Sequence, residues 1–229
     1  EWADAPLTAK GWQQAAALRR HVDAAPGGLE RFVEEVELVV CSPLTRAVQT
    51  AVGLFGRSEG DRLLMAAGGE GGQPARYQRA GDPRIVAHEL CRETLGVHPC
   101  DRRRSLGELR EEFPGVDLGL VACEGDELWQ AAVRESNEEL QSRGREFLRW
   151  LLRRPERVVA VVCHSGFLLQ TWTAAAGSAG LAHHPENCAL VPMVLADRHA
   201  GADGEYAWPG GEEGLDDPPP GQPWTPRKA

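Results

Sequence analysis

The stretch Val158-Val-Ala-Val-Val-Cys-His164-Ser-Gly166 decides the fold. Its short apolar run is typical of a buried strand, and it ends in a turn that presents one polar side chain, His164. The earlier stretch Glu37-Leu-Val-Val-Cys-Ser-Pro-Leu-Thr-Arg46 has the same form and presents Arg46. Ligands of open α/β folds bind outside the carboxyl ends of the strands. The pair therefore predicts a phosphate site at the edge of a sheet.

Helical and strand patterns alternate along the rest of the chain, which predicts an α/β fold with a largely parallel sheet. Thr8 has the position of an N-cap before an alanine-rich helix. We expect helices at about 8–24, 45–55, from 105, 124–154 and 166–176, and strands at 38–41, 84–90, 158–163 and 188–196.

The chain is long enough for one substantial domain, which we place at residues 1–198. Residues 57–81 are rich in Gly, Glu and Arg, and we expect a long surface loop there. Residues 199–229 are rich in Gly, Pro and acidic side chains, and we expect a disordered tail.

Composition argues against some classes of partner and favours one type of cellular compartment. The formal net charge is −9, which argues against a nucleic-acid partner. No apolar run reaches the roughly 20 residues that span a bilayer, so we expect no membrane partner. The six cysteines form no CxxC pair, and we interpret them as free thiols. This favours a reducing compartment, the cytoplasm, with an organelle as the open alternative.

His164 and Arg46 each have a functional and a structural interpretation. His164 precedes a helix whose first amides attract anions, but it could also be a buried histidine bonded to the backbone. Arg46 falls in the first turn of its helix, where a cation conflicts with the helix dipole and a phosphate would relieve the conflict. It could equally be a surface arginine paired with a carboxylate.

Three further groups are candidates. Glu93 follows the strand at 84–90 and could protonate a leaving oxygen, with Glu89 as its competitor. The run Arg102-Arg-Arg104 could contact a phosphorylated substrate or form a solvated turn. The histidines have no acidic or cysteine partner at metal-ligand spacing, so we expect no metal and no other cofactor.

Four segments together resemble the histidine phosphatase superfamily, which has the phosphoglycerate mutase-like fold. They are Asp4-Ala-Pro-Leu-Thr-Ala-Lys-Gly11, Cys41-Ser-Pro-Leu-Thr-Arg-Ala-Val-Gln-Thr-Ala51, Leu90-Cys-Arg-Glu93 and Val162-Cys-His-Ser-Gly-Phe167. The run Cys100-Asp-Arg-Arg-Arg-Ser105 looks like the plant and algal phosphoglycerate mutase-like subgroup. The resemblance implies a three-layer sandwich with a mostly parallel central sheet.

The resemblance also implies a mechanism and roles. A histidine from an Arg-His-Gly motif takes the phosphoryl group of a small phosphate ester, and water or a second hydroxyl then removes it without a metal. Arg46 and His164 would hold the phosphoryl group, and Glu93 would be the proton donor. The implied substrate-binding residues are Thr8, Ser42, Arg102, Arg103 and Ser165.

The sequence departs from the family pattern in one respect: it contains no Arg-His-Gly. That motif normally lies on the first strand, so we expect an N-terminally truncated fold that lacks this strand and is inactive alone. For the full-length protein we favour a phosphatase over a mutase. The alternatives are a non-catalytic relic that binds phosphorylated ligands, and a protein that interacts through its tail. The oligomeric state stays open.

Overall fold

A parallel sheet forms the centre of the computed structural model, which describes residues 2–25, 28–56, 83–176 and 184–196. The strands lie in the order β3-β2-β1-β4, and each neighbouring pair is parallel. Their carboxyl ends therefore meet at one edge, as predicted. The strands are β1 (Leu38–Cys41), β2 (Arg84–His88), β3 (Val116–Leu120) and β4 (Val159–Val162).

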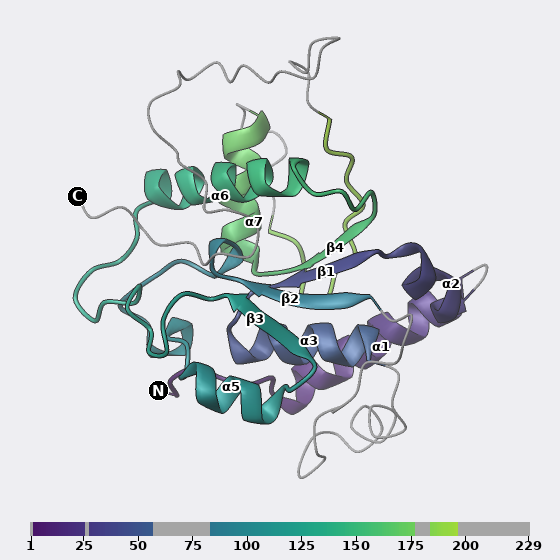
Figure 1. Ribbon diagram of the computed structural model, residues 1–229, viewed down its shortest axis with the longest axis horizontal. Coiled ribbons are helices and arrows are strands. Elements are labelled where there is room, and N and C mark those ends of the chain that lie inside the picture. Colours follow the sequence, from purple (N-terminus) through teal and green to yellow (C-terminus); the bar gives the residue numbers. More distant parts are fainter. Residues whose placement is uncertain (1, 26–27, 57–82, 177–183, 197–229) are drawn as a thin grey trace.

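Helices cover both faces of the sheet, which makes the predicted three layers (Figure 1). Helices α6 and α7 lie on one face, and α1, α3 and α5 lie on the other. The helices are α1 (Ala9–Asp23), α2 (Gly28–Glu35), α3 (Thr45–Phe55), α5 (Leu106–Glu112), α6 (Asn137–Leu152) and α7 (Ser165–Ala176), with single 3-10 turns η1 (Glu89–Cys91) and η2 (Pro99–Asp101). None of them is long and apolar enough to cross a membrane, within the part of the chain that the structure describes.

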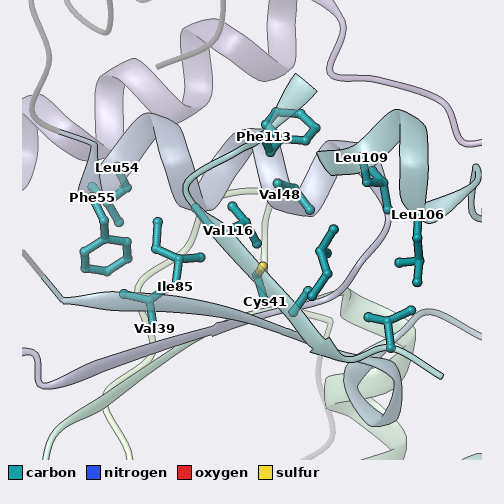
Figure 2. Packing of buried hydrophobic residues seen from close by; sticks show 14 of the residues in the cluster. Val39, Cys41, Val48, Leu54, Phe55, Ile85, Leu106, Leu109, Phe113 and Val116 are labelled. Atoms are coloured by element: carbon teal, nitrogen blue, oxygen red, sulfur yellow. The ribbon is translucent and has the colours of Figure 1, made fainter. Parts of the chain in front are cut away.

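Strand β1 shows why the central strands are apolar throughout. Successive side chains of a strand point to opposite faces, and here both faces are covered. Val39 and Cys41 pack into the core beneath α3 and α5 (Figure 2), whereas Leu38 and Val40 pack into the core beneath α6 and α7. The four-residue run is thus buried without alternation.

Helices α1 and α3 are capped in different ways, one by a neighbouring residue and one by a distant residue. The Thr8 hydroxyl accepts a hydrogen bond from the Gly11 amide and caps α1, as predicted. Helix α3 has no side-chain cap of its own. Asp4 supplies one from a distance, because its carboxylate accepts bonds from the amide and the hydroxyl of Thr45, both at 2.8 Å.

The predicted helix at 124–154 is wrong in its first half. The helix begins at Asn137, and Ser136 and Glu139 form a capping box there. The preceding residues form a loop because their side chains bond to distant backbone and charged groups. Asp126 pairs with the guanidinium of Arg92 at 2.6 Å, and its carboxylate also accepts from the Arg103 amide.

The sequence patterns also missed two elements and proposed one that is absent. Strand β3 contains Gly119 and Asp117, which are poor strand formers, and α2 begins directly after Pro26-Gly27, a pair typical of a turn. Residues 188–196, which we expected to be a strand, pair with no strand among the described residues, and Val194 is exposed. Pro192 lies in this segment and has no amide hydrogen for a ladder.

Strand β4 lies at the edge of the described sheet, where β1 is its one partner. Its four residues are accordingly only half-buried, unlike those of β1. The predicted loop at 57–81 and the tail at 199–229 lie outside the described residues. The domain limits at 1–198 therefore stay a prediction.

Candidate active site

His164 lies two residues after the end of β4 at Val162 and directly precedes Ser165, the first residue of α7. It is 7% exposed, and its Nε2 is buried without a hydrogen-bond partner among the described residues. Burial lowers the pKa of His164 well below its ordinary value, and the charges of nearby arginines, Arg46 among them, lower it further. The imidazole is therefore neutral at neutral pH. An unpaired buried nitrogen is costly, and a bound ligand would remove that cost.

Arg46 lies in the first turn of α3, and its guanidinium is held in place by the η2 turn. It donates to the Cys100 carbonyl at 2.7 Å and to Asp101 Oδ1 at 2.8 Å. Asp101 relieves the conflict with the helix dipole, so a phosphate is not needed for that purpose, contrary to our argument from sequence. The two bonds use two of the five guanidinium donors, which leaves others for an anion.

Glu93 lies beside His164 because its carboxylate meets the start of α7. The Gly166 amide lies 3.4 Å from Glu93 Oε2, and the Thr94 amide donates to Oε1 at 3.0 Å. A carboxylate is favoured at a helix N-terminus. The structure therefore brings Arg46, Glu93 and His164 to the same edge of the sheet.

Glu89, the competitor of Glu93, is directed elsewhere. Its carboxylate is buried, accepts a bond from Arg92 Nη1 at 3.0 Å and lies 3.3 Å from Arg103 Nε. Arg92 is fully buried and also pairs with Asp126. Glu89 thus balances buried cations, and Glu93 is the better candidate for a proton donor.

The two arginines predicted to bind substrate occupy different environments. Arg103 is 3% exposed, and its terminal nitrogens donate to the carbonyls of residues 104 and 123–125. This geometry favours a role in holding that loop over a substrate contact. Arg102 is exposed, and its guanidinium lies 5.4 Å from the ring centroid of Trp129. It stays a candidate for substrate contact.

The remaining predicted residues, Ser42, Thr8 and Ser165, have local positions or roles in the structure. Ser42 is fully buried, its amide donates to the Val162 carbonyl at 3.0 Å, and its hydroxyl accepts from the Leu44 amide. Thr8 caps α1. Ser165 is exposed at the first position of α7, next to His164. Their contacts with substrate stay predictions.

Four residues that support the site were not among the sequence candidates: Asp4, Asp101, Arg134 and Arg143. Arg134 binds the second oxygen of Asp101 at 3.0 Å. For Arg143 a signal was present, since it lies with Leu140, Gly144 and Phe147 on the buried stripe of α6. A charged residue on an apolar stripe indicates a buried ion pair.

Comparison with known proteins defines the class to which this fold and site belong. The profile of the histidine phosphatase superfamily (branch 1) matches residues 1–61. A phosphoglycerate mutase-like protein of Arabidopsis thaliana is 41% identical over 234 residues, which cover 95% of this chain and 84% of the relative. Phosphoglycerate mutase-like protein 1 of the same plant is 43% identical over 210 residues, covering 86% and 72%.

Among solved structures, Bacillus stearothermophilus YhfR aligns with 76% of this chain and 69% of its own, with a TM-score of 0.41 and 22% identity. The family assignment rests on the two plant relatives. The chain belongs to the histidine phosphatase superfamily, as its four motifs predicted. Membership in this superfamily supports phosphatase- or mutase-type activity.

Proposed function

We propose that the full-length protein is a metal-independent phosphatase that acts on small phosphate esters through a phosphohistidine intermediate. One observation carries the proposal: a neutral, buried His164, whose Nε2 has no hydrogen-bond partner in the part of the chain that the structure describes, lies at the same edge as Arg46 and Glu93. Ring nitrogen and guanidinium donors are suited to phosphate oxygens. They can supply the charge stabilisation that a metal supplies in other phosphoryl-transfer enzymes.

The proposed reaction has two steps. The nucleophilic histidine, which is not in the printed sequence, attacks phosphorus, and the ester P–O bond breaks. Glu93 gives its proton to the leaving oxygen. Water then attacks the phosphohistidine, Glu93 takes a proton from that water, and the P–N bond breaks to release inorganic phosphate. Arg46 and a donor N–H of His164 stabilise the phosphoryl oxygens in both steps.

A mutase is the second candidate, and the names of the plant relatives favour it. It would use the same first step, but a substrate hydroxyl would replace water in the second. A non-catalytic relic that binds phosphorylated ligands is the third. Glu93 argues against the relic, because binding alone does not need a proton donor beside the phosphate.

The first test compares the printed chain with a chain extended upstream along its coding sequence. We expect the extended chain to release phosphate from small esters in the presence of EDTA, and to form an acid-labile phosphoprotein. The printed chain alone should do neither. An extended chain without activity would refute the proposal that the protein is an enzyme. Transfer of phosphate between substrates would favour the mutase. Loss of activity in EDTA would refute metal independence.

Substitution tests the site within the extended chain. His164→Ala and Arg46→Ala should each lower kcat at least a hundredfold, which is about 2.7 kcal/mol of transition-state stabilisation. Arg145→Ala, on a partly exposed position of α6, is the control. Losses below threefold for both site variants would refute the assignment.

We also propose a reducing compartment such as the cytoplasm. All six cysteines are free in the structure. Burial raises the pKa of the Cys41 and Cys163 thiols to about 12, so these two thiols are unreactive at neutral pH. Localisation of the full-length protein by tagged fluorescence tests this assignment.

A further inference from the structure

Arg143 is a buried cation whose hydrogen-bonding capacity is fully used inside the protein. It lies in α6 and is 4% exposed. Its Nε donates to Glu135 Oε1 at 2.8 Å, and Nη2 donates to Glu135 Oε2 at 2.6 Å. Nη1 donates to the carbonyls of Leu90 and Arg92, both at 2.8 Å, and Nη2 also reaches the Glu93 carbonyl at 3.1 Å. These bonds account for all five guanidinium donors.

Arg143 differs from Arg46 because all of its hydrogen-bond donors are used within the protein. Arg46 keeps donors for an anion, whereas a ligand could bind Arg143 only by breaking bonds that the protein already makes. Arg143 therefore acts on the site through what it holds. It holds the backbone of residues 90–93, which carries the candidate proton donor.

Glu135 binds the backbone on the C-terminal side of Glu93. Its Oε2 accepts from the Leu95 amide at 2.9 Å, and its own amide donates to the Leu95 carbonyl at 3.0 Å. The segment that contains Glu93 is thus fixed on both sides, by Arg143 before it and by Glu135 after it. The carboxylate of Glu135 also balances the charge of Arg143, which would otherwise be buried without a counterion.

The same guanidinium lies against the helix that Glu93 meets. It is 5.4 Å from the ring centroid of Phe167, in the first turn of α7. Phe167 follows Gly166, whose amide faces the Glu93 carboxylate. The Arg143 side chain therefore contacts both the segment that carries Glu93 and the first turn of α7. The relative position of these two parts sets the distance between the Glu93 carboxylate and the helix start.

We propose that Arg143, together with Glu135, is a positioning residue that fixes the Glu93 carboxylate relative to His164 and the start of α7. The inference rests on the proposed function, in which Glu93 protonates the leaving oxygen. A lysine keeps the charge but lacks the planar fork, so it cannot hold three carbonyls and a carboxylate together. Arg143→Lys should therefore displace Glu93 without removing any group that touches substrate.

The test measures the extended chain on two esters with different leaving groups. For Arg143→Lys we expect kcat/KM for glycerol 3-phosphate, a poor leaving group, to fall at least tenfold. For p-nitrophenyl phosphate, whose leaving group needs no proton, kcat/KM should fall less than threefold, because kcat/KM reports the first step and not the hydrolysis of the phosphohistidine that both esters share. Arg145→Lys on the same helix should change neither. A general loss of folded protein would lower both rates equally, and equal losses would overturn the inference.

A second measurement on the printed chain is independent of activity. In Arg143→Lys, amide hydrogen exchange at Thr94 and Leu95 should become at least tenfold faster, while exchange at Val39 and Val40 in β1 should stay unchanged. If Arg143→Lys does not fold, Glu135→Gln, which keeps the arginine, takes its place in both measurements. If the unsubstituted extended chain has no activity, the proposed function fails, and hydrogen exchange alone tests the positioning role. Exchange at Thr94 and Leu95 that is as slow in the variant as in the unsubstituted chain would overturn that role.

Discussion

Gly166 lies where α7 meets Glu93, and its lack of a side chain is what permits the contact. A Cβ at this position would lie 2.4 Å from Glu93 Oε1 and 3.1 Å from Glu93 Cδ. Both are atoms at the end of a flexible side chain, so the carboxylate can move away at little cost to the fold. The backbone of α7 would tolerate alanine, which is a better helix former than glycine by about 1 kcal/mol.

Gly166→Ala should therefore separate function from stability. We expect the free energy of unfolding to stay within about 1 kcal/mol of the original value, because helix propensity offsets the small rearrangement. Turnover of glycerol 3-phosphate by the extended chain should fall at least tenfold, since the carboxylate is displaced. Urea denaturation and steady-state kinetics measure the two effects. Unchanged turnover would show that Glu93 does not act from its observed position.

At the scale of the elements, α6 and α7 pack so closely that one position admits no side chain. Gly144 of α6 faces Thr171 of α7, and a Cβ would lie 2.4 Å from Thr171 Oγ1 and 3.1 Å from its Cα. The second of these atoms belongs to the backbone, so the helix itself would have to move. The pair matters for the site because α6 carries Arg143 and α7 begins beside His164.

Gly144→Ala should destabilise the chain despite the helix propensity of alanine. We expect a loss of about 1–3 kcal/mol, the usual cost of overpacking a well-packed core. Ser142→Ala, at an exposed position of the same helix, is the matched control and should be neutral or slightly stabilising. The measurement compares the midpoints of urea denaturation of the two variants. Equal midpoints would mean that α6 and α7 can move apart without a loss of stability.

At the scale of the whole molecule, two buried histidines link stability to pH. His88 is 2% exposed and packs edge-on against the rings of Phe147 and Trp150. Its Nδ1 accepts from the Leu90 amide, and burial lowers its pKa to about 3. The pKa of His164 is also lowered. Unfolding restores ordinary values near 6.5, so below that pH the unfolded chain binds protons that the folded chain does not.

The free energy of unfolding should therefore be highest above about pH 6.5 and fall as the pH drops. Each histidine contributes a slope of up to about 1.4 kcal/mol per pH unit. His88→Asn keeps an acceptor for the Leu90 amide but cannot titrate, so it should reduce the slope by about that amount. Urea denaturation at pH 7.5, 6.5 and 5.5 measures the slope of the unfolding free energy with pH. His21→Asn, at an exposed position of α1, is the control. An unchanged slope would contradict a neutral, buried His88.

Local patterns predicted much of the fold and the centre of the site. Strands β1 and β4, the helix at Thr45–Phe55 and the cap at Thr8 were expected where the structure has them. Each depends on neighbouring residues: an apolar run, a Ser-Pro turn or a capping hydroxyl. Arg46 and His164 were expected at the edge of the sheet for the same reason, since each directly follows a strand-and-turn segment.

The errors occurred where distant contacts override local preference. Residues 124–136 have helical composition, but Asp126 is taken by Arg92, which is 34 residues away in the sequence. The segment at 188–196 has apolar residues typical of a strand, but a strand also needs a partner, and no local pattern supplies one.

The sequence by itself determined that helices alternate with the strands of a parallel sheet, the family and the two residues at the strand ends, because those depend on short segments. Only the tertiary structure showed the different environments of Glu89 and Glu93 and the bonds that hold the segment around Glu93. Asp4 caps a helix 41 residues away, and Arg143 binds carbonyls 50 to 53 residues away. Such bonds arise when packing brings distant segments together, because a buried charge must find partners wherever the fold offers them.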